Sequence, residues 1–106
     1  MCAGAPSDRA AAVPTVMVDN DRVRVTEWRF APGAATGWHV HEFDYVVTPI
    51  EGQPVDMVDA EGAVRRVEMI PGVTYFREAG VAHDVINAGT GELRFVETEL
   101  KEPRRG

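Results

Sequence analysis

The chain has 106 residues, a hydrophobic fraction of 44%, a charged fraction of 26% and a net charge of −6. This length predicts one domain with a single modest core, and the negative charge argues against nucleic acid as a partner because it repels phosphate backbones. No apolar run approaches the ~20 residues that span a bilayer, so no membrane partner is expected. The only cysteine is Cys2. A chain that cannot form an internal disulfide fits a reducing compartment, and we expect a cytoplasmic location.

The two ends of the chain have the composition of tails. Residues 1–13 are rich in alanine and lack the basic start and continuous apolar core of a secretory signal. We expect them to be disordered or to form a short helix that ends at Ala12, before Pro14. Residues 101–106 form a polar tail with Arg104 and Arg105. Residues 14–100, which no linker or repeat interrupts, are expected to form the single domain.

Between the tails, short runs of β-branched and aromatic residues alternate with turns that contain Gly, Pro, Asn or Asp. Many short strands at close spacing, without a convincing long helix, are typical of an all-β sandwich or barrel. The expected strands are 15–18, 22–30, 39–50 with a tight turn at 42–44, 55–58, 63–70, 73–77, 83–87 and 93–100.

The second of these strands changes phase part-way along. Val23 and Val25 alternate with arginines, whereas Trp28 and Phe30 fall on the opposite phase. Either a bulge re-aims the strand, or both of its faces are partly covered, for example by a partner subunit.

The three histidines all lie in or beside expected strands. His39 and His41 are two residues apart, so on a strand their imidazoles share one face and can reach one metal ion. His83 stands at the start of a later strand. If the fold brings His83 to the same point, the three side chains offer the nitrogen ligands that transition metals prefer.

Two spaced motifs then carry a family resemblance. Gly33, five residues, His39, one residue and His41 resemble the first half of the first cupin motif. Gly72, five residues, Glu78, one residue, Gly80, two residues, His83, three residues and Asn87 resemble the second, with Glu78 where the family usually has proline. The resemblance implies a cupin-type jelly-roll β-barrel, also called a double-stranded β-helix, in which His39, His41 and His83 converge on a metal.

Two further stretches resemble a narrower group within that family. Residues 20–33 and the run Asp44-Tyr45-Val46-Val47 look like short stand-alone bacterial cupins, some of them named for a role in β-alanine degradation. Such a name gives a pathway association and specifies no reaction.

The family's fourth metal ligand, a glutamate three or four residues after the second histidine, has no direct counterpart. That window holds Tyr45 and Val46, while Asp44 comes one residue early and Glu42 directly follows His41. A one-residue shift in the turn would make Asp44 the fourth ligand. A strand that simply continues would instead place Tyr45 on the histidine face. Asp44 and Tyr45 are therefore the candidate catalytic groups beside the metal.

The implied cofactor is one divalent transition metal ion per chain, iron in the first place, with zinc, nickel and manganese as alternatives. The function that we expect is dioxygenase-like chemistry on a small anionic metabolite. A metal-dependent isomerase or lyase, or a non-catalytic binding or sensing protein, are the alternatives. Single-domain cupins are commonly dimers, so the resemblance also implies a homodimer.

Other side chains have open roles at this stage. Arg29 and Arg77 either bind an acidic substrate or are solvated or salt-bridged. The groups that can support the metal ligands and fix their tautomers are Glu97, Glu99, Asn87 and backbone carbonyls, and the sequence does not choose among them. The aromatic residues expected in the core or cavity lining are Trp38, Phe43, Tyr45, Tyr75 and Phe76.

Overall fold

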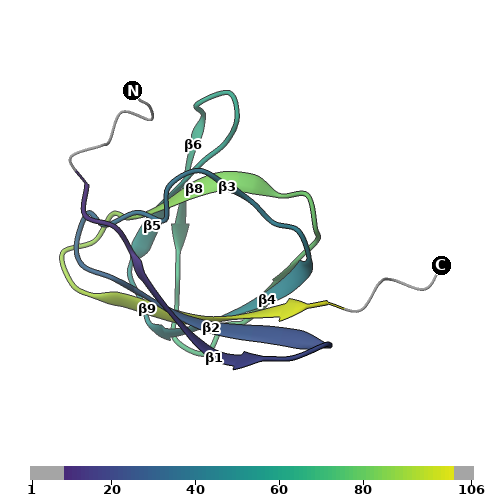
Figure 1. The fold of residues 1–106 in the computed structure, drawn as a ribbon. Helices are drawn as coiled ribbons and strands as arrows, with labels where there is room; N and C mark the ends of the chain where they lie inside the picture. The colour runs from purple at the N-terminus through teal and green to yellow at the C-terminus, as the bar shows by residue number, and fades with distance from the viewer. Residues whose placement is uncertain (1–8, 102–106) are drawn as a thin grey trace.

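A computed structural model describes residues 9–101 as two antiparallel β-sheets that face each other around a common interior (Figure 1). The all-β expectation is confirmed, since no helix occurs among these residues. Residues 1–8 and 102–106, including Arg104 and Arg105, lie outside the described part. The strands are β1 (Val13–Asp19), β2 (Val23–Phe30), β3 (His39–Val40), β4 (Asp44–Glu51), β5 (Pro54–Val58), β6 (Val64–Glu68), β7 (Tyr75–Arg77), β8 (Ala82–Asn87) and β9 (Leu93–Leu100).

The strand order gives a jelly-roll topology. One sheet has the order β1-β2-β9-β4-β7 and the other the order β3-β8-β5-β6. The last strand, β9, lies between β2 and β4, and so joins the start of the chain to its middle. The expected long strand at 39–50 is divided, as predicted, by a turn that separates β3 from β4. This division lets β3 join the second sheet while β4 stays in the first.

The core fills the space between the sheets with side chains from alternating strand positions. Phe30, Leu93 and Val55 are fully buried, and the rings of Phe30 and Phe95 lie 5.5 Å apart. On β9 the side chains at 93, 95, 97 and 99 share the inward phase. On β9 the inward residues near its start, such as Leu93, belong to the core, whereas Glu97 further along lines the cavity of the candidate site.

The phase change in β2 has a partial explanation. Strand β2 pairs with β9 in unbroken register from Val23 to Phe30, and the bulge lies in the neighbouring strand β1, between Val16 and Val18. Trp28 and Phe30 share the inward phase, and Val25 lies half-buried on the outer face. Covering of that face by a partner subunit stays a prediction.

The structure corrects the sequence analysis for two of the aromatic residues that were expected in the core or the cavity lining. Trp38 and Phe76 are 52% and 51% exposed, so neither belongs to the core or the cavity lining. Phe76 lies between Tyr75 and Arg77 on a three-residue strand, and its side chain takes the outward phase.

Residues 9–12 form no helix, because Ala11 bridges Ala35 and the Ala12 amide donates to the Ala35 carbonyl at 2.9 Å.

A buried asparagine connects β2 to the turn after β8. The Asn87 Nδ2 group donates to the carbonyls of Phe30 at 3.1 Å and Gly91 at 2.9 Å, and its Oδ1 accepts from the Gly89 amide at 2.9 Å. Asn87 is only 1% exposed. Nδ2 also lies 3.3 Å from the Ala31 carbonyl, so this one side chain serves four backbone groups, which need hydrogen-bond partners where they are buried. Its role is structural, and the expectation that it supports the metal ligands is not met by these contacts.

Asn87→Ala should therefore lower the free energy of unfolding by about 2–4 kcal/mol, because it leaves several buried polar groups without partners. Urea denaturation measures this difference. Asn20→Ala is the matched control: the Asn20 Oδ1 accepts from the amides of Arg22 and Val23 in an exposed turn, where water can replace it. A loss of about 1 kcal/mol or less is expected there. Equal losses in the two variants would contradict this assignment of Asn87.

Candidate metal centre

The pairing of β3 with β8 brings the three histidines together. His39 and His83 are direct partners across the two strands. Directly opposed residues in an antiparallel pair point to the same face. His41 follows β3, where its amide donates to the Val81 carbonyl and its carbonyl accepts from the Gly80 amide, both at 2.8 Å. These two bonds hold His41 against the segment before β8, just beyond the last pair of the ladder, and its imidazole turns to the same side as that of His39.

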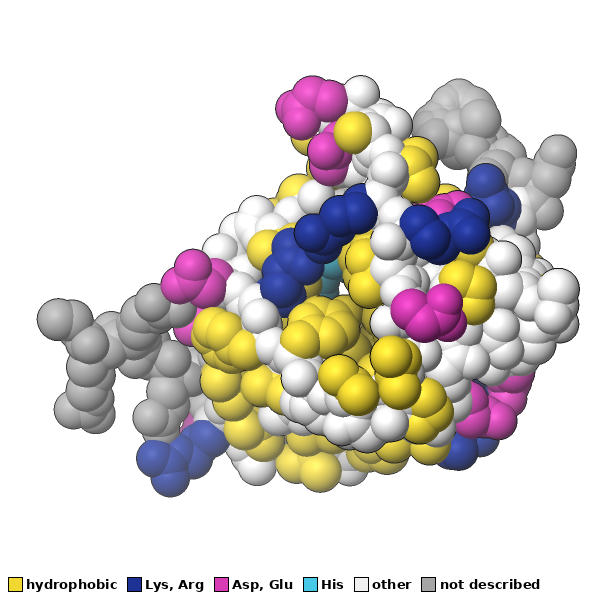
Figure 2. Space-filling view, turned by 180° about the vertical axis from the view of Figure 1, so that it is seen from behind, with side chains coloured by type: hydrophobic (Ala, Val, Ile, Leu, Met, Phe, Trp, Pro, Cys, Tyr) yellow, Lys and Arg dark blue, Asp and Glu magenta, His cyan; other side chains and the backbone are white. Residues whose placement is uncertain are grey.

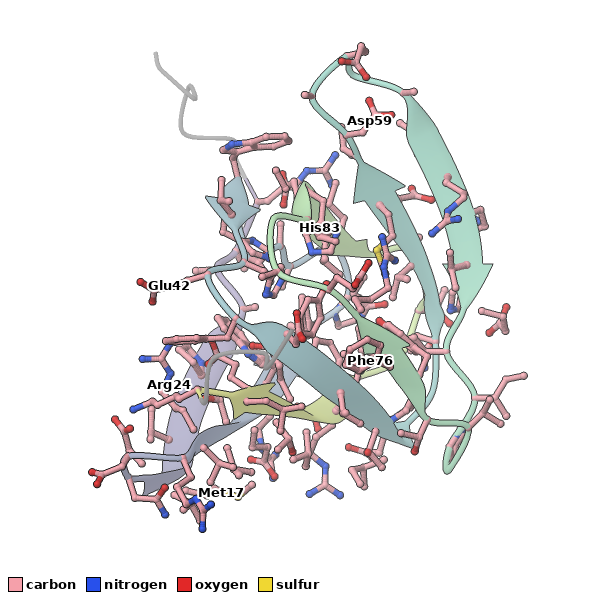
Figure 3. The ribbon with its side chains drawn as sticks, turned by 90° about the vertical axis from the view of Figure 1, so that its right-hand side faces the viewer. Met17, Arg24, Glu42, Asp59, Phe76 and His83 are labelled. Atoms are coloured by element: carbon pink, nitrogen blue, oxygen red, sulfur yellow. The ribbon has the colours of Figure 1, made fainter. Side chains whose placement is uncertain are left out.

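The imidazoles converge through their Nε2 atoms. The His41 Nε2 lies 3.0 Å from that of His39 and 3.2 Å from that of His83. Possible ligand atoms of all three residues lie within 4.8 Å of one another. His83 points inward from β8 in Figure 3. The convergence predicted from the two spaced motifs is therefore present.

Hydrogen bonding fixes which nitrogen of His39 carries the proton. Its Nδ1 lies 2.9 Å from the Gly37 carbonyl oxygen, which can only accept, so Nδ1 donates. The Nε2 of His39 then presents a lone pair to the cluster. An Nδ1–H donated to a backbone carbonyl is the usual second contact of a metal-binding histidine.

The other two rings are buried and neutral. His41 stacks on Tyr45 with ring centroids 3.8 Å apart and planes inclined by 14°. Burial is the main cause that lowers the pKa of His41 to about 4 and that of His83 to about 3, and the neighbouring imidazoles and Arg77 act in the same direction. Neutral imidazole is the form that binds metal.

The cluster lines a small cavity of about 40 Å³ that also contains two polar groups without partners. The Tyr45 hydroxyl and the Trp28 indole N–H are buried, and within residues 9–101 neither has a hydrogen-bond partner. Burial raises the pKa of Tyr45 further above the neutral range, so its hydroxyl stays protonated. Because unsatisfied buried groups are rare, both groups indicate that a polar ligand belongs in this cavity.

The residues present fit a metal ion. A single proton can satisfy only one of the two short Nε2–Nε2 contacts, whereas one cation satisfies all three lone pairs. Nitrogens bound to one ion at about 2.1 Å, with angles of roughly 90–110° between them, lie about 3.0–3.4 Å apart. The observed separations of 3.0 and 3.2 Å match that spacing. An ion held by these three imidazoles would keep coordination positions for water or a reactant.

The proposed fourth ligand, Asp44, is not a member of this cluster. It begins β4, and its Oδ1 accepts a hydrogen bond from the Ala79 amide at 2.8 Å. Tyr45, the alternative, takes the interior position beside the histidines. The role of Asp44 as a ligand therefore stays a prediction, and a three-histidine site forms without it.

The three expected supporting residues have different environments. Glu97 lines the cavity, and burial together with the charge of Glu99 raises its pKa to about 7. The Trp28 indole N–H offsets part of this rise, although its geometry falls short of a hydrogen bond. Glu99 instead pairs with Arg24 through contacts of 2.7 and 3.0 Å. Of the three, Glu97 is therefore the one placed to act at the site.

Two larger hollows reach the cluster from outside. One, of about 320 Å³, is lined by His83 with side chains of β5, β6 and β7. The other, of about 440 Å³, is lined by His39 and His41 with side chains of β1, β2 and β9. Figure 2 shows a hollow with a histidine visible in its depth and Lys or Arg side chains beside it. A small molecule can thus approach the cluster, while the inner cavity has room for little more than water or dioxygen.

Comparison with known proteins agrees with this geometry. The family model described as Cupin domain matches residues 26–99. The chain belongs to the cupin family. A similar protein is the "Beta-alanine degradation protein BauB" of Pseudomonas aeruginosa, 55% identical over 95 residues that cover 90% of this chain and 99% of the relative.

Solved structures give the same result. A cupin domain protein from Bordetella pertussis Tohama I shares 48% identity and superposes with a TM-score of 0.86, covering 90% of this chain and 98% of that one. The polyketide cyclase RemF from Streptomyces resistomycificus, at 23% identity and a TM-score of 0.66, covers 90% of this cupin and 70% of that chain. The latter similarity concerns the fold alone.

Sequence reasoning missed Trp28 and Arg65 as site residues. Trp28 lines the inner cavity and Arg65 the hollow beside His83. The sequence does contain an indication for Trp28, because it lies two residues before the core residue Phe30 and so shares its face of the strand. Arg65 gave none, because its neighbour Arg66 is equally basic and only the register of β6 separates the two.

Replacing a histidine should remove the metal. We expect His39→Ala and His83→Ala to lose bound metal on purification. Asp44→Asn distinguishes a site of three histidines from a site of three histidines and Asp44. If three histidines suffice, Asp44→Asn keeps metal near the wild-type level. If Asp44 coordinates, affinity falls by about tenfold or more. Elemental analysis and chelator competition provide the measurements. Unchanged metal content in both histidine variants would contradict the site.

Glu97 should make stability depend on pH in metal-free protein. Its ordinary pKa is 4.5 and its folded value about 7, so between these values the folded state holds a proton that the unfolded state has released. Stability therefore falls as pH rises through this range. Relative to the wild type, Glu97→Gln should gain on the order of 2–3 kcal/mol between pH 4 and pH 8.

Urea denaturation with chelator present, at a series of pH values, tests this expectation. The contributions of His41 and His83 are common to both proteins and cancel in the comparison. A stability difference that does not change with pH would contradict a buried, protonated Glu97.

Proposed function

We propose that this cupin is a metal-dependent enzyme that acts on a small anionic metabolite, with oxidative cleavage by dioxygen as its chemistry. The observation that carries the proposal is the convergence of three imidazole Nε2 atoms on a cavity with open approaches. An iron ion held by His39, His41 and His83 would supply dioxygen activation. Zinc, nickel or manganese, which the same ligands accept, would favour isomerase or lyase chemistry instead.

The protein's own residues prepare the site for such a reaction. His39 is held in one tautomer by the Gly37 carbonyl, and His41 is oriented by stacking on Tyr45. The low pKa values of His41 and His83 keep their lone pairs available at neutral pH. Ligands held in this way need little reorganisation when a metal binds, which favours a defined geometry.

The cavity wall offers groups that can bind a reactant or handle a proton. The Tyr45 hydroxyl and the Trp28 N–H are donors without partners. The pKa of Glu97, near 7, lets its carboxylate take up or release a proton at neutral pH. Aromatic and aliphatic side chains, including Tyr75 and Phe95, complete the wall and limit the entry of water.

The relative from Pseudomonas aeruginosa supports a metabolic context. Its name, "Beta-alanine degradation protein", together with 55% identity over almost all of its length, supports a role of this cupin in the same pathway. The name specifies no reaction, so the substrate class rests on the site. Cytoplasmic location, which fits a degradative enzyme, remains part of the proposal. None of the described residues forms a helix that could cross a membrane.

Oxygen uptake tests the proposed reaction. Iron-loaded protein should consume dioxygen with a member of a panel of small amino acids, aldehydes and thiols, and His39→Ala should reduce the rate by at least about a hundredfold. An oxygen electrode combined with mass spectrometry of the products provides the measurement.

The alternatives give different results in the same assay. Turnover without oxygen uptake would favour an isomerase or lyase. Tight, metal-independent binding without turnover would favour a binding or sensing protein, and would contradict the enzyme proposal.

The homodimer is part of the proposal as well. Strand β1 is the outer strand of its sheet, and Val13, Val16 and Met17 on it are 57%, 56% and 50% exposed. An unpaired edge with apolar side chains suits antiparallel pairing with a second copy, which buries the same patch on both subunits.

Val16→Lys should therefore convert a dimer into a monomer, because it places a charge at that contact. Val64→Lys, at a position 61% exposed on β6, is the control and should leave the dimer intact. Sedimentation velocity measures both. A wild-type protein that is monomeric at micromolar concentration would contradict the dimer.

A further inference from the structure

Two arginines share the hollow that leads to His83. Arg65 lies on β6 opposite Met57, and Arg77 lies on β7 opposite Tyr45. Both side chains line the hollow of about 320 Å³, together with His83. In Figure 2, Lys or Arg side chains flank a hollow in which a histidine is visible. Two guanidinium groups and one candidate metal ligand thus face the same space.

These two arginines differ from most other basic residues that the structure describes. Within residues 9–101, no hydrogen bond or ion pair engages either guanidinium group, although acidic residues exceed basic ones by the margin that gives a net charge of −6. The basic residues that do pair with carboxylates include Arg24 with Glu99, Arg29 with Glu27, Arg66 with Asp56, Arg94 with Glu51 and Lys101 with Asp19.

The charge of both arginines acts on the interior. Arg77 lowers the pKa of His41 and His83, beyond the larger effect of burial. Both Arg77 and Arg65 oppose the rise in the pKa of Tyr75 that burial causes. Their positive field therefore covers the approach to the histidines.

One acidic residue, Asp59, lines the same hollow. Its Oδ1 accepts hydrogen bonds from the amides of Glu61 and Ala63, both at 2.9 Å, within the β5–β6 turn. Figure 3 shows Asp59 near the tip of that hairpin, away from His83. The carboxylate is thus engaged by its own turn and leaves the arginines available to an external anion.

We propose that Arg65 and Arg77 form a carboxylate-binding site at the entrance to the metal centre, which holds the anionic end of the substrate while the rest extends past His83. A guanidinium group matches a carboxylate through two parallel N–H···O bonds, and a second one strengthens the attraction. The volume of the hollow limits the ligand to a small acid. The link to catalysis rests on the proposed function, whereas the binding of the anion does not require it.

Propionate, with propionamide as its uncharged counterpart, tests the site directly. Titration of metal-free and zinc-loaded protein, followed by amide shifts in NMR at constant ionic strength, should show saturable binding of propionate with shifts at Arg65, Arg77 and Ala82. Propionamide should bind at least tenfold more weakly. Arg65→Gln and Arg77→Gln should each weaken propionate binding by tenfold or more.

Arg66→Gln is the matched control, because Arg66 neighbours Arg65 but pairs with Asp56, and it should leave propionate binding unchanged. Thermal unfolding verifies that each variant folds. If Arg77→Gln does not fold, the exposed Arg65→Gln still decides the question. Equal binding of propionate and propionamide, equal affinity in both arginine variants, or tighter binding of inorganic phosphate than of propionate would each overturn the proposal.

The outcomes separate this inference from the proposed function. Arginine-dependent propionate binding without oxygen uptake by iron-loaded protein would refute the oxygenase and leave the carboxylate site standing. Metal binding and oxygen uptake that are unaffected in Arg65→Gln and Arg77→Gln, at subsaturating substrate, would refute the role of this site in holding the substrate and leave the oxygenase standing.

Discussion

The antiparallel pairing of β3 with β8 is the constraint on which the site depends. His39 faces His83 directly, and hydrogen bonds of His41 with Val81 and Gly80 hold it against the segment before β8. Because side chains alternate between faces, this register alone directs three imidazoles into the interior. Gly80 makes the approach possible: its φ of 98° suits a residue without a Cβ atom, and its amide reaches the His41 carbonyl from that conformation. The backbone conformation of these two segments therefore determines the geometry of the candidate metal site.

Much of this arrangement could be predicted from the sequence, for reasons that differ by residue. Turns with Gly, Pro or Asp separate the strands and so predict them, and the spacing of the histidines within strands predicts which face they share. The sequence does not choose between Asp44 and Tyr45, since a one-residue change in the turn before β4 exchanges them. The structure places Tyr45 inside and gives Asp44 a hydrogen bond to Ala79. Contacts between distant strands, such as the shared hollow of Arg65 and Arg77, have no local signal.

The charge distribution divides the molecule by function. On the outer surface, Arg29, Arg66, Arg94 and Lys101 form ion pairs with carboxylates, and Arg24 forms a bidentate pair with the buried Glu99. Arg65 and Arg77 face the approach to the histidines instead. Inside, Glu97 has an acid-base equilibrium near neutrality because burial and Glu99 disfavour its charge. A protein with a net negative charge can thus have a positively charged entrance to its site and an interior carboxyl group that exchanges a proton near neutral pH.

The same register also limits how this site can change during evolution. Substitutions in the strands around it alter volume or charge by degrees, and the fold can absorb many of them. Insertion or deletion of a single residue between Val40 and His41, or between Gly80 and His83, would turn an imidazole to the opposite face in one step. The number of residues in these two segments is therefore a more stringent requirement than their composition. Lineages that keep metal binding should vary freely in composition near the site, whereas changes of length should collect in the hairpin turns, such as the one at 59–63.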